Sequence, residues 1–146
     1  MGIKVAGIWE LSWNTPLNES WLWSFPLREF QVAEWAMTPI TGITHMDKWN
    51  SNGIKFTEYE SVEAMMAEFP GDYTRVYIDD KGAIPLQDFT HPENAIYIFG
   101  NVGNSALPYK REEDFSVVVP TVINTGTAWP HQCLMAVLYD RLVKAS

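Results

Sequence analysis

The stretch NAIYIFGNVGNSALP, residues 94–108, decides the fold that the sequence predicts. Its first part is a run of β-forming residues, from Ala95 to Phe99, that stops abruptly at Gly100. A second glycine, Gly103, follows in the same loop. We expect a buried strand that ends in a tight turn, because glycine lets the backbone bend sharply and approach other groups closely.

Similar patterns along the chain predict further strands. We expect them at residues 3–11, 34–40, 54–59, 74–78, 95–99 and 115–119. The last three are each followed by a loop rich in polar, glycine or proline residues, which are DDKG, GNVGN and PTVINTGTAWP. In open α/β sheets ligands bind outside the carboxyl ends of the strands. Three such loops side by side predict one small-molecule pocket, with backbone groups as its polar contacts.

Helices are expected between these strands. Ser61 is a good N-cap, and the apolar side chains after it recur at helical spacing until Pro70-Gly71. A second helix is expected over 130–144, and a third over 21–32, interrupted near Pro26 and preceded by a loop at 14–20. Strands alternating with helices predict an α/β fold with a mostly parallel sheet and flanking helices, in one domain spanning 1–146.

The expected C-terminal helix is apolar around most of its circumference. Its apolar residues are Cys133, Leu134, Met135, Val137, Leu138, Leu142 and Val143. A helix of this kind needs burial on two sides. One side packs on the sheet, and we expect a second subunit on the other.

Charge and composition restrict the partners. The formal net charge is −8, and only ten lysines and arginines are spread along the chain. Nucleic-acid binding usually needs a basic patch, so we do not expect DNA as a partner, and any RNA contact has to be local or assembled across a dimer. The sequence contains no apolar run near the roughly 20 residues that span a bilayer and no signal-peptide pattern. A single cysteine, Cys133, excludes an internal disulfide, and we expect a cytoplasmic protein.

Tryptophan is concentrated in the first third of the chain, where six of the seven lie. Their packing in the core or in an interface is the main interpretation, because each tryptophan buries a large area. Base stacking is the alternative, although basic residues are not interleaved with these tryptophans.

Three segments in order resemble a known family. PENAIYIFGNVGNSALP, then FSVVVPT, then CLMAVLYDRL are similar to the cofactor-binding half of the SPOUT methyltransferases, in the SpoU/TrmH branch. That family has a strand leading to F-G-N-E-G-x-G-L, a strand ending I-P-M, and then S-x-N before a hydrophobic helix. Order and spacing match over residues 74–146, whereas the first 60 residues resemble the family only in layout.

The resemblance implies a fold, a ligand and a reaction. It implies a C-terminal trefoil knot over about residues 74–146, with a homodimer formed through the C-terminal helix. It implies S-adenosylmethionine as the cofactor, held chiefly by backbone groups of three knot loops. It implies methylation of a ribose 2′-hydroxyl in tRNA or rRNA.

Residues at matching positions are the candidate cofactor site. The resemblance assigns this role to Ile78, Gly100, Asn101, Val119, Thr127 and Leu134. Contacts made through the backbone tolerate changes of side chain, so these assignments survive sequence divergence. No metal site is expected.

The catalytic positions match less well. Asn14 or Asn18 matches the asparagine of the first motif, but no arginine follows in register. Val102 stands at the glutamate of F-G-N-E-G and Trp129 at the asparagine of S-x-N. His131, beside the expected pocket, is a candidate base or a histidine exposed in the first turn of a helix; His45 and His91 are expected at the surface. Three hypotheses stay open: an RNA methyltransferase, a divergent SPOUT-fold homodimer that binds S-adenosylmethionine without methylating RNA, or an unrelated α/β nucleotide-binding module.

Overall fold

The computed structural model describes residues 2–9, 16–39, 52–101, 104–123 and 130–145. Its strands are β1 (Gly2–Trp9), β2 (Glu34–Pro39), β3 (Lys55–Glu58), β4 (Thr74–Ile78), β5 (Ile84–Pro85), β6 (Asn94–Phe99) and β7 (Phe115–Val118). The helices are α1 (Pro16–Glu29), α2 (Val62–Ala67) and α3 (Pro130–Lys144), with short 3-10 turns η3 (Leu86–Asp88) and η4 (Leu107–Tyr109).

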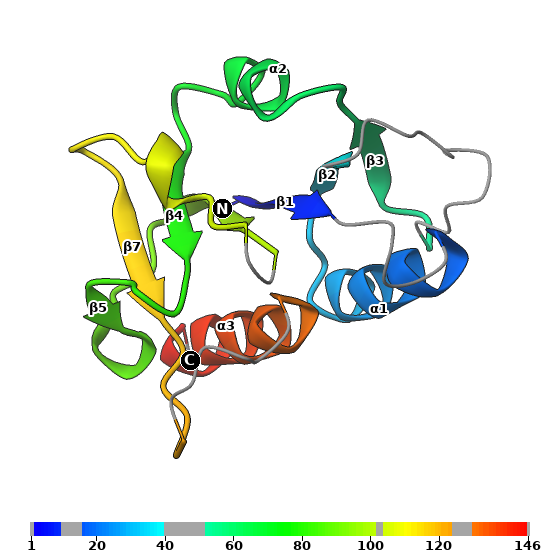
Figure 1. Ribbon diagram of the computed structural model, residues 1–146. Helices are drawn as coiled ribbons and strands as arrows, with labels where there is room; N and C mark the ends of the chain where they lie inside the picture. The colour runs from blue at the N-terminus through cyan, green and yellow to red at the C-terminus, as the bar shows by residue number, and fades with distance from the viewer. Residues whose placement is uncertain (1, 10–15, 40–51, 102–103, 124–129, 146) are drawn as a thin grey trace.

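Within the described residues the strands form one seven-stranded sheet in the order β3-β2-β1-β6-β4-β7-β5. Every strand pairing in it is parallel. The expected α/β class is confirmed, and the sheet is parallel throughout rather than mostly parallel. Figure 1 shows α1 and α3 on one side of the sheet and α2 on the other.

The two faces of the sheet bury separate clusters of side chains. On the α1 and α3 face, Trp23 and Leu27 of α1 pack with Leu134 of α3 against β1, β4 and β6. On the α2 face, Met65 and Met66 pack with residues of β1, β4 and β6. Side chains of parallel strands covered on both faces are expected to be apolar, and Ala95–Phe99 of β6 is buried throughout. The tryptophans Trp23 and Trp35 are core residues, each 1% exposed.

Most predicted elements are confirmed within a residue or two. The helix at 130–144 and the strand at 74–78 have the expected bounds. Ser61 caps α2, since its side chain accepts a hydrogen bond from the Ala64 N–H at 3.1 Å. β5 was not predicted, because two residues are too few to give a strand pattern in the sequence.

Two predictions for the first helix were wrong: the residue at which it begins and its interruption near Pro26. Residues 16–20, expected as a loop, are helical, and α1 begins at Pro16, where a proline fits because the first N–H groups have no helical partner. The helix also continues through Pro26. Trp23 and Leu27 lie on either side of that proline and are both buried, so packing against the sheet outweighs the cost of the lost hydrogen bond.

His91 was expected at the surface, and this was wrong. Its side chain is only 5% exposed and lies between two hydrogen-bond partners. Nε2 lies 2.7 Å from Oδ2 of Asp140, and Nδ1 lies 2.7 Å from the Tyr97 hydroxyl. Arg141 donates to the same hydroxyl at 3.0 Å. This cluster fastens the C-terminal half of α3 to the segment before β6.

The cluster predicts a stability that falls in mild acid. Burial lowers the pKa of His91 below its ordinary value, although Asp140 opposes the shift. The unfolded chain therefore binds a proton at a higher pH than the folded chain does. The contribution of His91 to the free energy of unfolding is complete above about pH 6.5, the ordinary pKa, and is lost as the pH falls through the lower pKa of the folded state. Urea unfolding between about pH 8 and pH 5 measures the decline. We expect His91→Gln to make this decline smaller, and an unchanged profile in that variant would contradict this account. His131→Gln should also make it smaller, because burial lowers the pKa of His131 too.

Candidate functional site

The carboxyl ends of β6, β4 and β7 lie side by side at one edge of the sheet. Ile78 at the end of β4 is level with Phe99 of β6 and with Val117 of β7. The three loops expected to line a pocket therefore start from neighbouring strands. Because all the strands are parallel, each loop leaves the sheet in the same direction.

The loop after β4 is fixed to β7 by main-chain contacts. The Asp79 N–H donates to the Val117 carbonyl at 3.0 Å, and the Gly82 N–H donates to the Asp79 carbonyl at 3.0 Å. A Cβ atom on Gly82 would overlap the main chain of Val117 and Val118. The turn thus needs a glycine to lie this close to β7.

The loop after β6 folds back on itself at Gly100. Asn101 and Asn104 exchange two backbone hydrogen bonds, of 2.9 and 2.8 Å, in an antiparallel bridge. A Cβ on Gly100 would lie 2.5 Å from the Asn104 carbonyl oxygen and 3.0 Å from the Ala106 nitrogen. The tight turn predicted from the sequence is confirmed. It leaves Gly100 and Asn101 half-buried at the carboxyl edge.

The first turn of α3 meets α1 near the same edge. The rings of His131 and Trp23 make an edge-on contact with centroids 6.5 Å apart, and the Trp23 indole N–H donates to Glu19 at 3.1 Å. Burial lowers the pKa of His131, while the charge of Glu19 opposes the shift. A half-buried imidazole whose pKa is lowered in this way is neutral at neutral pH. Burial also raises the pKa of Cys133, which makes its thiol a poor nucleophile.

The candidate cofactor residues differ in how they are exposed. Ile78 and Leu134 are buried in the core, at 6% and 0% exposure, so any ligand contact by Ile78 is through its backbone. Val119 is half-buried just after β7. Thr127 and Asn14 lie outside the described residues, as do Val102 and Trp129, and Asn18 lies in α1 with its side chain not described.

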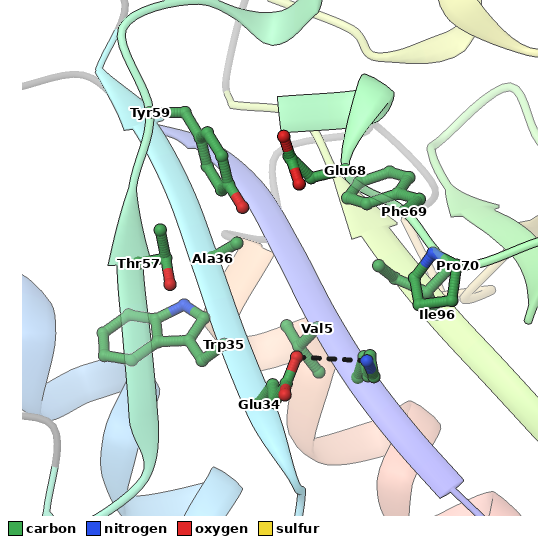
Figure 2. A pocket seen from close by; sticks show the side chains of 11 residues that line it. Val5, Glu34, Trp35, Ala36, Thr57, Tyr59, Glu68, Phe69, Pro70 and Ile96 are labelled. Atoms are coloured by element: carbon green, nitrogen blue, oxygen red, sulfur yellow. Dashed lines mark ion pairs between the residues drawn. The ribbon is translucent and has the colours of Figure 1, made fainter. Parts of the chain in front are cut away.

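A shallow hollow lies elsewhere, on the α2 face of the sheet (Figure 2). It is lined by residues of β1, β2, β3 and β6 and by the segments that follow β3 and α2, including Glu34, Ala36, Thr57, Tyr59, Glu68 and Phe69. Its Lys4 and Glu34 pair at 3.1 Å, the ion pair that Figure 2 marks. None of the residues that line it belongs to the loops after β4, β6 and β7. We therefore place the candidate site at the carboxyl edge.

Among the described residues, no group of three or more His, Cys, Asp or Glu side chains is placed to hold a metal ion. None of the described helices is long and apolar enough to cross a membrane.

Solved structures share this architecture. The chain is similar to the TrmH/SpoU tRNA modifying enzyme of A. aeolicus, with a TM-score of 0.77 and 13% identity over 97% of this chain and 74% of that chain. The structure matches the SpoU/TrmH methyltransferase fold. The resemblance of the sequence to this family is thereby confirmed at the level of the fold.

Two further neighbours carry information on ligand and reaction. The SpoU methyltransferase AviRb from Streptomyces viridochromogenes, solved with AdoMet, has a TM-score of 0.75 and 12% identity over 99% of this chain and 60% of that one. A protein studied for the 2-OH methylation of C/U34 on tRNA has a TM-score of 0.70 and 9% identity, over 98% and 90% of the two chains. No family model matches the sequence, and no curated protein matches it by sequence.

The Gly100 turn predicts a large effect of adding one methyl group. Gly100→Ala places a carbon 2.5 Å from the Asn104 carbonyl oxygen, so the main chain has to shift and we expect a loss of about 1–3 kcal/mol in the free energy of unfolding. Gly71→Ala is the matched control, because nothing lies within 4 Å of a Cβ there. Urea unfolding measures both. Equal stabilities of the two variants would contradict the geometry of the turn.

Proposed function

We propose that this protein is an S-adenosylmethionine-dependent methyltransferase that acts on a ribose 2′-hydroxyl of tRNA or rRNA. The observation that carries the proposal is the glycine turn after β6, at the carboxyl edge of a sheet with SpoU/TrmH architecture. An AdoMet complex of one structural neighbour and the 2-OH methylation of tRNA named for another support the ligand and the reaction.

The edge of the sheet suits a ligand held through backbone groups. Its glycine turns bring main-chain segments close together, and their carbonyl oxygens keep a second acceptor site for hydrogen bonds from adenosine. We propose that Ile78, Gly100, Asn101, Val119, Thr127 and Leu134 hold the cofactor. We further propose one domain over residues 1–146, with the cofactor-binding trefoil knot at about 74–146.

The protein's task in the reaction is to align the hydroxyl and remove its proton. Bound S-adenosylmethionine supplies an electrophilic methyl group on a sulfonium. Transfer of that methyl group would require this chain to align the ribose hydroxyl with it and to supply a base that takes up the hydroxyl proton. We propose His131 as that base, because burial keeps its imidazole neutral, and Asn14 or Asn18 as the residue that orients the ribose.

The pairing of cations favours a second candidate, a SPOUT-fold homodimer that binds S-adenosylmethionine without methylating RNA. Lys4 and Lys55 both pair with Glu34, Arg111 pairs with Asp114, and Lys144 pairs with Asp140. A cation that pairs with a carboxylate attracts phosphate less strongly than an unpaired one.

Methyl transfer to RNA separates the two candidates. The protein is incubated with total RNA and S-adenosylmethionine that carries a labelled methyl group, and the RNA is digested to nucleosides. We expect label in 2′-O-methylated nucleosides. His131→Gln should lower the rate by about 10²–10⁴-fold, the usual contribution of a general base, while binding of the cofactor persists. Cofactor binding without any label in RNA would establish the second candidate instead.

We also propose that the protein is a homodimer formed through α3. One face of this helix packs on the sheet with Leu134, Val137 and Leu138. The opposite face exposes Met135, Tyr139, Leu142 and Val143, each at 49–60%. Four large apolar side chains on one exposed helix face are typical of an interface.

This interface predicts a clear effect of one charge. Tyr139→Glu places a carboxylate in the middle of the exposed face, so we expect the variant to be monomeric at concentrations at which the wild type is dimeric. Ala64→Glu adds the same charge on exposed α2 and should leave the dimer intact. Sedimentation equilibrium measures the masses. A wild-type monomer, or a Tyr139→Glu dimer, would contradict the assignment.

A further inference from the structure

The loops after β4 and β6 are joined by side chains as well as by the sheet. The Ser105 hydroxyl donates to Oδ2 of Asp79 at 2.6 Å, between residues 26 positions apart in the sequence. The same hydroxyl accepts a hydrogen bond from the Leu107 N–H at 3.0 Å. Ser105 therefore uses both its donor and an acceptor site, and its rotamer is fixed between the two loops.

Asp79 is fixed on its own side of this contact. Its second carboxylate oxygen, Oδ1, accepts from the Lys81 N–H at 2.9 Å, and its backbone N–H donates to Val117 of β7 at 3.0 Å. A short hydrogen bond from a hydroxyl to a carboxylate is among the stronger side-chain contacts. Through Asp79 and Ser105, the loops that follow β4 and β6 are thus connected to each other and to β7.

We propose that Asp79 and Ser105 are positioning residues for the cofactor: their hydrogen bond holds the Gly100 turn and the Asp79–Gly82 turn at the spacing that S-adenosylmethionine needs. This inference rests on the proposed function, because it assigns a role within the same site. Neither residue has to touch the ligand. The bond orders the two loops before binding, and a site that is already ordered loses less conformational entropy when the ligand binds.

Ser105 is a feature of this chain rather than of the motif that the chain resembles. In F-G-N-E-G-x-G-L the position of Ser105 is glycine, which has no side chain to reach Asp79. The chain also carries Val102 in place of the motif's glutamate in the same loop. The serine gives this loop a polar anchor that the motif itself does not contain.

The hydrogen bond between Ser105 and Asp79 lies at the surface, so its loss should change the order of the two loops more than the stability of the whole fold. Ser105 is exposed and Asp79 is half-buried, and both lie beyond the ends of their strands. Exposed polar contacts contribute little to global stability. A variant that loses this bond should therefore stay folded and lose affinity for the cofactor.

Calorimetric titration with S-adenosylhomocysteine, a non-reactive product, tests the proposal. We expect Ser105→Ala to weaken binding by about tenfold, the effect of losing one charge-assisted hydrogen bond. Ser105→Thr keeps the hydroxyl and should restore wild-type affinity. Asp79→Asn, which keeps an acceptor oxygen without the charge, should lie between the two.

Ser61→Ala is the matched control. It also removes a serine oxygen that accepts a backbone N–H, at 3.1 Å, but that bond is local to the N-cap of α2 and joins no two loops. We expect it to lower stability slightly and to leave the affinity for S-adenosylhomocysteine unchanged.

Hydrogen exchange without ligand separates positioning from a general loss of structure. In Ser105→Ala we expect faster exchange at the amides of residues 79–82, although the changed residue lies in the other loop, and unchanged exchange in β1 and β6. Wild-type affinity in Ser105→Ala, or unchanged exchange at 79–82, would overturn the positioning role and leave the proposed function standing. No binding by the wild type would overturn both.

Discussion

The two ladders that β6 makes, with β1 on one side and β4 on the other, hold the rest of the structure in place. All of Ala95–Phe99 is buried, and the two ladders pair this strand along its length. Because both ladders are parallel, the chain has to cross back over a face of the sheet before each new strand. Helices α1 and α2 supply the crossings from β1 to β2 and from β3 to β4, and the loops that follow β4, β6 and β7 all emerge at one edge. The candidate site is a consequence of strand direction.

A site built mainly from backbone groups tolerates change in its side chains. The turns at Gly100 and Gly82 depend on the absence of a Cβ rather than on a functional group. This explains how a chain with 9–16% identity to its structural neighbours keeps their architecture. Catalysis is more demanding, since it needs particular proton acceptors at particular places. Cofactor binding is therefore the better supported half of the proposed function, and methyl transfer depends on side chains such as His131.

The sequence predicts well those features that short-range patterns encode. The strand before Gly100, the cap at Ser61 and the apolar circumference of α3 were all predicted, because each depends on neighbouring residues. Contacts between distant segments were not. His91 becomes buried only when α3 brings Asp140 and Arg141 against it, and Ser105 meets Asp79 only when β6 lies beside β4. The interruption of α1 at Pro26 was predicted wrongly for the same reason. The burial of Trp23 and Leu27 offsets the cost of this proline, and that burial depends on packing against the sheet.

Ligand-induced protection from hydrogen exchange tests the central claim, that the carboxyl edge of the sheet binds the cofactor. Exchange is followed peptide by peptide with and without S-adenosylhomocysteine. We predict slower exchange at residues 79–82, 100–106 and 119–123, with no change around the hollow at residues 57–70. Protection confined to that hollow would contradict the account, and so would the absence of protection at a saturating concentration of S-adenosylhomocysteine.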